Sequence, residues 1–518
     1  MQYVMAVDIG TGSGRAVIFD AQGRQVSVAQ QEWWHHEDPA FPGSMNFDVE
    51  GNWRTVCDCI RGALAKAGLR GSDIVAVAAS SMREAIVAYD ADGREIWACA
   101  NVDSRAVAEV RFLTQEYAEL ERSLYQQTGQ TFALGALPRL LWIKNHQPEV
   151  FARIRHISML SDWVAFRLCG ELAVEASNAG TTGLLTLDDR AWLSAPFTDV
   201  LGLAADVCPP VRESGDVLGT VTAQASAQCD LATTTLVCVG GGDCQIGTLG
   251  LGLAEVNQCA VLGGTFWQQI VNVPPATRDA AMDLRMNPHV VPGMNQMEAI
   301  SFFVGAVARW FRDAFAGEEL AQVDDPGDAY TLLEKLGEQV PPGAYGIIPV
   351  FSDEMHYGRW MHAAPSFLNL GLDKDKYHKG SLFKALQENA CIVAARNLER
   401  IFALCGQRPA HIVFAGGAAK SPLWSQTLAN ATGMEVVVTT VTEASALGCA
   451  MAAAQGAGMA EMAQLARQWV QVARSHTPDN ALKMLYDELG ERWARAYAAQ
   501  LELVKAGVTT AMWKAPGL

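Results

Sequence analysis

The chain has 518 residues, more than one hydrophobic core usually serves, so we expect two large domains. Half of the residues are hydrophobic and 18% are charged, as in an ordinary globular protein. The formal net charge of −17 argues against a nucleic acid or an anionic membrane as the main partner, although backbone N–H groups can hold a phosphate on an acidic protein.

The chain enters an apolar segment at once, without the basic region, apolar stretch and cleavage site of a signal peptide. Apolar runs such as IVAVAA at 74–79 are far shorter than a membrane span. Twelve scattered cysteines without a C-x-x-C pair favour buried thiols over a zinc site or disulfides. We therefore expect a cytoplasmic protein.

The first half predicts three strands at 3–10, 15–20 and 24–34, joined by turns that contain glycine. A helix at 49–67, a buried strand at 73–80 and a hairpin at 85–99 follow, and helices are expected over much of 104–170.

The second half opens in the same way, with a strand, a glycine turn and a strand at 258–273. An amphipathic helix at 381–404, a strand at 411–417, a helix that begins at Ser421-Pro422 and a small-residue segment at 444–455 come later. The repetition predicts a duplicated α/β unit with domains at 1–250 and 251–518 and a ligand cleft between them.

The first glycine turn, DIGTGSGR at 8–15, places Asp8 at the end of a strand. Its N–H groups and the hydroxyls of Thr11 and Ser13 suit phosphate oxygens, and Asp8 suits a metal ion or its water shell. The spacing differs from the dinucleotide fingerprint, and the chain has no P-loop. Taken alone, the segment is equally an ordinary tight hairpin.

Two later segments carry similar chemistry. VLGGTFWQQ at 261–269 repeats the phosphate-turn ingredients in Gly264 and Thr265, and two such turns facing across a cleft would clamp a nucleotide. FAGGAAKSPLW at 414–424 is either plain strand-to-helix chemistry or a flat glycine surface for adenine, with Ser421 as the helix cap. Lys420 is expected to be solvated.

Around Asp243, the segment VGGGDCQIGTLG at 239–250 leaves much of the backbone bare. Three consecutive glycines cost conformational entropy and pack no side chains, so a bulky group or another stretch of backbone must come close. Arg83 and Glu84, just after a buried strand, are either a surface charge pair or a polar pair for substrate hydroxyls. We expect a structural ion pair at Asp103 and Arg105 and no catalytic histidine.

These motifs, in this order and over essentially the whole chain, resemble those of the FGGY carbohydrate kinases. The resemblance implies two actin-like, ribonuclease H-like α/β domains of the hexokinase-type ATPase fold, with an interdomain cleft that closes around ATP and Mg²⁺. It makes Asp243 the catalytic base. The sites it implies are Arg83, Glu84, Asp243, Gln245, Trp267 and Gln268 for the substrate; Thr11, Gly12, Ser13, Arg15, Gly264, Thr265, Gly416, Gly417, Ala418 and Ser421 for ATP; and Asp8 and Asp243 for the metal ion.

Departures from the family pattern bear on the substrate. Asn101 stands where the sugar kinases carry an aromatic residue, and Leu134 and Gln268 stand where glycerol kinases carry tyrosine and phenylalanine. We therefore expect a small, hydrated dicarbonyl acceptor, with a pentulose or polyol kinase as the first alternative and a non-enzymatic nucleotide-gated module as the second. The sequence leaves a homodimer and a regulatory protein partner open.

Overall fold

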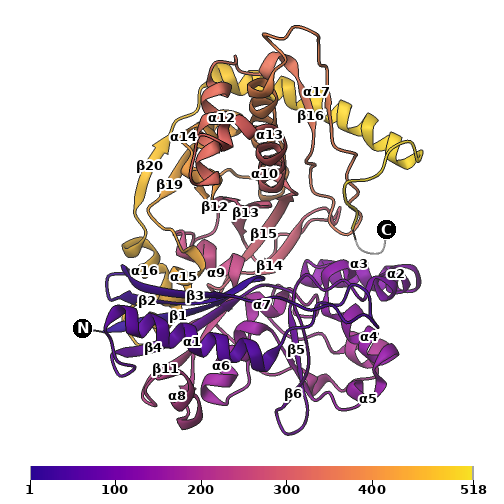
Figure 1. Ribbon diagram of the computed structural model, residues 1–518. Helices are drawn as coiled ribbons and strands as arrows, with labels where there is room; N and C mark the ends of the chain where they lie inside the picture. The colour runs from indigo at the N-terminus through magenta and orange to yellow at the C-terminus, as the bar shows by residue number, and fades with distance from the viewer. Residues whose placement is uncertain (1, 516–518) are drawn as a thin grey trace.

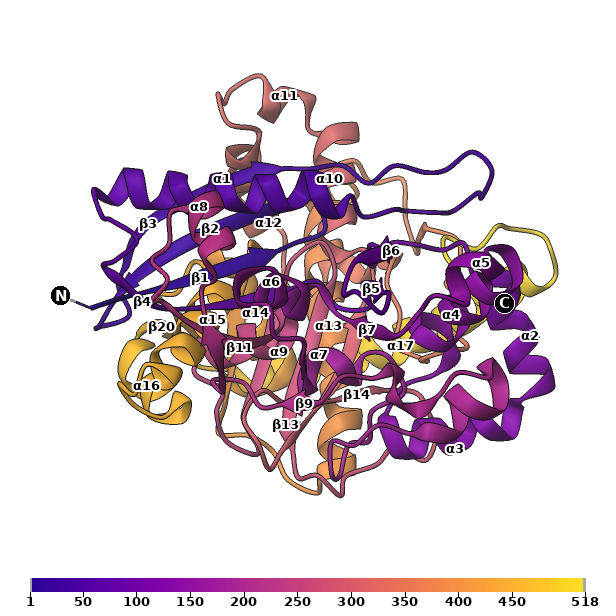
Figure 2. The ribbon, with the colours of Figure 1, turned by 90° about the horizontal axis from the view of Figure 1, so that it is seen from below.

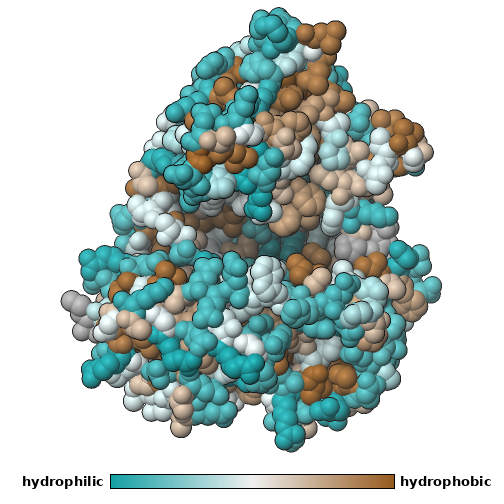
Figure 3. All heavy atoms as spheres, in the orientation of Figure 1, coloured by the Kyte–Doolittle hydropathy of each residue, from teal (hydrophilic) through white to brown (hydrophobic). Residues whose placement is uncertain are grey.

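The structure of the protein is a computed structural model that describes residues 2–515. Two lobes, each built around a mixed β-sheet, lie one above the other in Figure 1. The surface is hollowed between them (Figure 3). Among the described residues, no helix has both the length and the apolar character needed to cross a bilayer.

The first sheet holds the expected amino-terminal strands. Its order is β10 (Val217–Thr220), β11 (Leu236–Gly242), β4 (Ile74–Ser81), β1 (Tyr3–Ile9), β2 (Ser13–Asp20) and β3 (Gln25–Glu32). β1, β2 and β3 form an antiparallel meander, whereas β4 runs parallel to both β1 and β11. The predicted meander and the buried strand after it are confirmed.

Both faces of this sheet are covered, because alternate residues of a strand point to opposite faces. Met5 and Val7 of β1 pack in one core with α1 (Val49–Ala67) and α6 (Leu160–Cys169). Val4 and Ala6 pack in another with α15 (Ala444–Gly456) and α9 (Asp243–Gly250). In Figure 2, which views the molecule from below, α1 lies across the strands of this sheet. The helix at 49–67 is confirmed with the expected bounds.

The second sheet carries the repeated strand–turn–strand unit. Its order is β14 (Arg285–Pro288), β15 (Asn295–Ser301), β13 (Trp267–Val273), β12 (Cys259–Gly263), β18 (His411–Ala415), β19 (Glu435–Thr439) and β20 (Val472–His476). The helices α10 (Val304–Phe315), α13 (Lys379–Cys405), α14 (Pro422–Thr432) and α17 (Asn480–Lys505) belong to the same lobe.

The longest of these helices, α13, differs from the amphipathic helix expected at 381–404. It is buried on most of its faces, because α10, α12 (Ala329–Glu338), α14 and α17 surround it and the sheet lies against it. A helix in the middle of a lobe has no polar face to present to water.

A smaller group of elements extends the first lobe to the right in Figure 1. The hairpin of β5 (Ile86–Tyr89) and β6 (Glu95–Cys99) pairs with β7 (His156–Ser158). Four helices and a core of their own complete it: α2 (Val107–Glu116), α3 (Ala118–Thr128), α4 (Ala136–His146) and α5 (Pro148–Phe151). The hairpin and the helices expected here are confirmed.

The remaining α-helices and strands are short. They are α7 (Ala176–Gly180), α8 (Ala223–Cys229), α11 (Gly317–Leu320), α16 (Met462–Trp469), β8 (Val174–Glu175), β9 (Val211–Arg212), β16 (Ile348–Val350) and β17 (Ser366–Leu368). The chain does not divide cleanly at 250, because α15 of the second half packs on β1, β4 and β11 of the first sheet. The domain boundary stays a prediction.

Candidate active site

The carboxyl ends of three neighbouring parallel strands meet at the edge of the first sheet that faces the second lobe. Asp8 of β1 lies beside Ser80 of β4, and Ser80 lies beside Gly241 of β11. Arg83 follows β4 and Asp243 follows β11, so the parallel pairing carries both toward Asp8. Sheet topology thus brings together residues that are far apart in the sequence.

Asp243 is the first residue of α9, and 40% of its side chain remains exposed. Its Oδ1 accepts a hydrogen bond from the backbone N–H of Cys244 (2.7 Å) and lies 3.9 Å from Nε of Arg83. Although part of the side chain stays accessible, partial desolvation inside the cleft raises the pKa of Asp243 to about 7; Arg83 opposes this, and the charges of Asp8 and Glu84 add to it. This carboxylate can exchange a proton near neutral pH and remains open to a ligand.

The glycines before Asp243 are explained largely by packing within the lobe. A Cβ atom on Gly240 would lie 1.7 Å from the carbonyl oxygen of Ala79 in β4, and one on Gly241 would lie 2.7 Å from a methyl group of Val290. The backbone that comes close is therefore that of the neighbouring strand. The bare segment lets β11 sit tightly on β4 and so fixes the position of Asp243.

Arg83 is buried rather than part of a surface charge pair. Its Nη1 and Nη2 atoms donate to the two carboxylate oxygens of Glu298 on β15, at 2.6 and 3.1 Å. Burial acts to raise the pKa of Glu298, but the charges of Arg83 and Arg285 and the hydrogen bonds from Arg83 and Gln268 together outweigh burial and lower it. Gln268 also donates to Glu298 Oε1 (3.0 Å), so Gln268 is brought to the site.

Glu84 is held in an unfavourable backbone conformation, with φ of +63°. Its side chain pairs with Arg285 of β14, and its carbonyl oxygen accepts from Arg139. Arg285 donates from Nε to Gln130 Oε1 at 3.0 Å. Strain kept by several partners is typical of a functional site.

The first glycine turn is open to solvent at Thr11 and Gly12, and a Cβ atom on Gly12 would meet nothing within 4 Å. Asp8 is already engaged. Its Oδ2 accepts from Arg15 Nε (2.8 Å) and its Oδ1 accepts from Ser80 Oγ (2.6 Å). Arg15 also pairs with Glu443, just before α15. Ser13 Oγ accepts a hydrogen bond from Gln30 (3.1 Å).

The second turn exposes Gly264 and Thr265, and the amino terminus of α10 abuts it. Gly305 donates its N–H to the carbonyl oxygen of Thr265 (3.0 Å). A Cβ atom on Gly305 would lie 2.3 Å from the carbonyl oxygen of Gly264. Helix amino termini favour anions. Gly305 belongs to no predicted motif, and its only signal in the sequence is a glycine at the start of a helical pattern.

The third turn lies beside the second, because β12 and β18 are parallel neighbours. Gly416 has φ of +92°, and a Cβ atom on it would lie 2.8 Å from the carbonyl oxygen of Gly263. Gly417 is exposed and Ala418 half-buried. Ser421 caps α14, as predicted, and donates from its hydroxyl to Glu334 (2.9 Å).

Two residues predicted to bind substrate are buried in the structure. Trp267 is 1% exposed and sits in the core between Phe414 and Trp424, with ring centroids 5.2 and 5.3 Å away, so its expected place on the substrate is wrong. Gln245 is fully buried, and its amide atoms have no hydrogen-bond partner within residues 2–515. Its role stays a prediction.

Several structural expectations are confirmed. Arg105 and Asp103 form a buried ion pair (2.6 Å), and Lys420 is exposed. The cysteines of the chain are free thiols in the structure. His289 is fully buried, and its Nδ1 accepts a hydrogen bond from the N–H of Val291 (3.0 Å).

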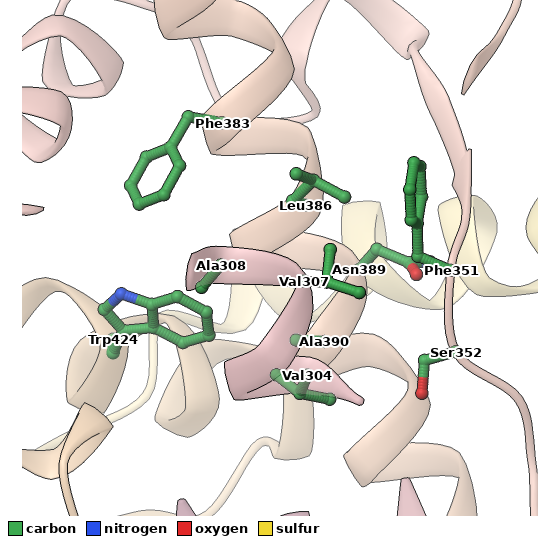
Figure 4. Close-up of a pocket in the computed structure, with 10 residues that line it drawn as sticks. All are labelled: Val304, Val307, Ala308, Phe351, Ser352, Phe383, Leu386, Asn389, Ala390 and Trp424. Carbon is green, nitrogen blue, oxygen red and sulfur yellow. The ribbon is translucent and has the colours of Figure 1, made fainter. Parts of the chain in front are cut away.

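Two cavities border the site. One of about 330 Å³ lies between the lobes beside Arg285 and Arg139, against the helices α2 and α4. The other, shown in Figure 4, lies between α10, α13 and the start of α14; its lining is mostly apolar and includes Val304, Phe383 and Trp424. With a volume of about 20 Å³, it is large enough for one water molecule and too small for a nucleobase.

Comparison with known proteins places this geometry in a family. Residues 3–250 match the N-terminal domain of the FGGY family of carbohydrate kinases, and residues 275–457 match its C-terminal domain. The chain belongs to the FGGY family of carbohydrate kinases. It is therefore a phosphotransferase that acts on an alcohol group.

Full-length relatives are known for this chain. It is 52% identical to an autoinducer-2 kinase of Salmonella typhimurium and 51% identical to one of Escherichia coli K12, in each case over 100% of this chain and 98% of the relative.

Solved structures of lower identity share the fold. The xylulose kinase from Rhodospirillum rubrum superposes with a TM-score of 0.85 at 24% identity, covering 97% of this chain and 99% of that one. Plasmodium falciparum glycerol kinase with ADP gives a TM-score of 0.83 at 15% identity, covering 96% and 98%. The expected fold of two actin-like domains is confirmed.

Proposed function

We propose that this FGGY kinase transfers the γ-phosphoryl group of ATP to the primary hydroxyl of autoinducer-2. The acceptor is 4,5-dihydroxypentane-2,3-dione, and the product is its 5-phosphate, a charged form of a quorum-sensing signal. The observation that carries this proposal is the 52% identity, over the whole chain, to an autoinducer-2 kinase. The solved pentulose kinases share the fold at 24% identity or less.

Asp243 is the proposed catalytic base. Its carboxylate is exposed to the cleft, and a pKa of about 7 lets it accept the proton of the acceptor hydroxyl as the phosphoryl group arrives. Phosphoryl transfer proceeds through a loose transition state, so the hydroxyl loses its proton late and a weak base suffices. Arg83, anchored to Glu298, holds the position of the carboxylate and keeps part of its charge balanced.

The glycine turns are the proposed nucleotide site. Thr11, Gly12, Ser13 and Arg15 of the first turn would face the phosphates from one lobe, and Gly264, Thr265 and the start of α10 would face them from the other. Gly416, Gly417, Ala418 and Ser421 would lie against adenosine. The open backbone at Gly12 and at Gly417 supports this assignment.

Mg²⁺ suits the carboxylates on this edge of the cleft. Asp8 raises the pKa of Asp243 through its charge, so the two acids share one region of the site. Within residues 2–515, no group of three or more His, Cys, Asp or Glu side chains is arranged to hold a metal ion. Mg²⁺ is commonly held by one or two carboxylates with water and phosphate. Asp243 fits a direct ligand, and Asp8, whose oxygens are bonded to Arg15 and Ser80, fits a contact through the water shell of the ion. When bound, the ion would neutralise phosphate charge.

We place the reaction in the cytoplasm, where ATP is available, and expect the lobes to close over the substrates and exclude water. Gln268, which bonds to Glu298, and Glu84, which pairs with Arg285, are the proposed contacts for the acceptor. Gln245 stays a candidate because its buried amide lacks a partner.

A panel of acceptors tests the proposal. The purified protein with ATP, Mg²⁺ and the dione should release ADP, with a kcat/KM well above the values for xylulose, ribulose and glycerol. Absence of turnover on the dione together with turnover on a pentulose would contradict it and favour a pentulose kinase.

A further inference from the structure

The end of the chain forms one wall of the cavity between the lobes. After α17 the chain turns back toward the side of the cleft where α2 and α3 lie (Figure 1). His362 donates its N–H to the carbonyl oxygen of Trp513 (2.8 Å), and Ala515 donates to that of Trp360 (2.7 Å). This pairing holds residues 513–515, which we call the C-terminal strap, alongside residues 360–362.

The strap is built into an aromatic cluster. The indole of Trp513 stacks on Phe302, with ring centroids 4.5 Å apart and planes 24° apart. Phe302 in turn contacts Trp360 at 4.6 Å and Phe266 at 5.1 Å. Phe266 directly follows Thr265, so the strap and the second phosphate turn share one wall.

The lining of the cavity is chemically mixed. Its charged residues include Arg285 and Arg139, which bind the side chain and the carbonyl oxygen of Glu84. The second half of the chain contributes an apolar wall of Phe266, Ile300, Phe302, Met355, Trp360 and Trp513, whereas the first half also contributes the polar residues Asn101, Asp103 and Ser104. Tyr357, which also lines the cavity, already donates its hydroxyl to Gln130 (2.8 Å).

We propose that the C-terminal strap, through Trp513, closes an apolar subsite for the methyl end of the acceptor. This proposal rests on the proposed function. The dione has a methyl group at C1 and its reactive hydroxyl at C5. Ile300 lies opposite Gln268 in the pairing of β13 and β15 and also lines the cavity. An acceptor whose hydroxyl end lies beside Asp243 and Glu84 would therefore extend its carbon chain past Gln268 into the cavity, with its methyl group toward Ile300, Phe302 and Trp513.

The subsite would discriminate against pentuloses, the substrates of kinases with the same fold. A pentulose carries a hydroxymethyl group at C1, and the side chains of Ile300 and Phe302 offer that hydroxyl no hydrogen-bond partner. An apolar pocket rejects an added hydroxyl by about 10- to 100-fold, because the buried group loses its hydrogen bonds to water. Trp513 thus acts as a specificity-determining residue.

Trp513→Ala tests the proposal in the full chain. Opening the wall admits water to the C1 end, so the ratio of kcat/KM for xylulose to that for the dione should rise by about tenfold or more. The KM for the dione should account for most of the change, and the KM for ATP should stay within about twofold of wild type. Val508→Ser, at a position 69% exposed in the same tail, is the matched control. It should leave kcat/KM unchanged for both xylulose and the dione.

Trp513→Phe keeps an aromatic wall and should keep the wild-type preference. If Trp513→Ala does not fold, as judged by thermal melting, Ile300→Thr supplies a hydroxyl partner in the same wall and should raise the same ratio. An unchanged ratio in a folded Trp513→Ala or Ile300→Thr variant would overturn the subsite. Equal losses of kcat/KM for xylulose, the dione and ATP would overturn it too. Failure of the proposed function looks different, because the wild-type protein itself would then not turn over the dione.

Discussion

Arg83 and Glu298 join the two lobes through a doubly hydrogen-bonded ion pair, 2.6 and 3.1 Å long, at the base of the cleft. Arg83 comes from the end of β4 and Glu298 from β15, so neither lobe holds the pair alone. Because Nε of Arg83 also lies 3.9 Å from Asp243, the pair couples the arrangement of the lobes to the charge of the proposed base.

Replacement of Glu298 should therefore act on Asp243. In Glu298→Gln the positive charge of Arg83 loses its partner, which favours the carboxylate form of Asp243 and lowers its pKa. We expect the acid limb of the kcat/KM profile to move to lower pH and thermal stability to fall, since breaking a buried pair costs about 3–5 kcal/mol when the partner is lost outright. Steady-state kinetics across pH and thermal melting measure both effects.

Glu95→Gln is the matched control for that variant. Glu95 pairs with Arg167 in the first lobe, outside the cleft, so its loss should lower stability and leave the pH profile in place. A profile that moves equally in both variants would contradict a specific link between Glu298 and Asp243.

The pH dependence of the wild-type enzyme follows from the pKa of about 7 at Asp243. The base must be deprotonated to act, so kcat/KM should be half-maximal near pH 7 and should fall by about tenfold for each pH unit below it. Nucleotide affinity, measured over the same range by fluorescence, corrects for the titration of ATP. An acid limb near pH 4, where an ordinary aspartate titrates, would contradict the raised pKa.

Gly305→Ala tests the contact between α10 and the second phosphate turn. The added Cβ atom would lie 2.3 Å from the carbonyl oxygen of Gly264, and this backbone cannot move without moving the turn. We expect the KM for ATP to rise by about tenfold or more, with a smaller effect on the acceptor. Gly317→Ala, where the Cβ atom meets nothing within 4 Å, should leave both values unchanged.

Removal of the metal ion should separate catalysis from stability. EDTA should abolish turnover, because the proposed ion neutralises phosphate charge. It should leave the melting temperature unchanged, because the described residues contain no cluster of three or more metal ligands. A lower melting temperature in EDTA would indicate a structural metal site and contradict the assignment of the ion to the phosphates.

The local architecture was predictable because its signals are local. Glycine turns, the helix over 49–67 and the cap at Ser421 are each encoded within a few residues. Glu298 and Arg285 were not predictable, because the packing of one lobe on the other brings them from some 200 residues away in the chain to Arg83 and Glu84. They carry no motif, and only the arrangement of the lobes makes them part of the site.

The error at Trp267 has a simple cause. Trp267 and Gln268 are neighbours on β13, and neighbours on a strand point to opposite faces. Only one of them can face the site: Gln268 reaches Glu298, and Trp267 packs into the core. Strand alternation alone shows that both cannot lie on one substrate wall, but choosing between the two faces requires the fold.

The central claim is that Asp243 serves as the base toward an acceptor alcohol, and turnover by Asp243→Asn tests it most directly. We predict a loss of turnover on the dione of about 10²- to 10⁴-fold with nucleotide binding retained. Because the pKa is raised from 3.8 to about 7, ionisation of Asp243 destabilises the folded state progressively as pH rises from about 4 to about 7. At pH 8 that cost is fully present in the wild type and absent in the variant, so the variant should melt no lower than the wild type. Turnover close to the wild-type rate in a folded, ATP-binding variant would contradict the account.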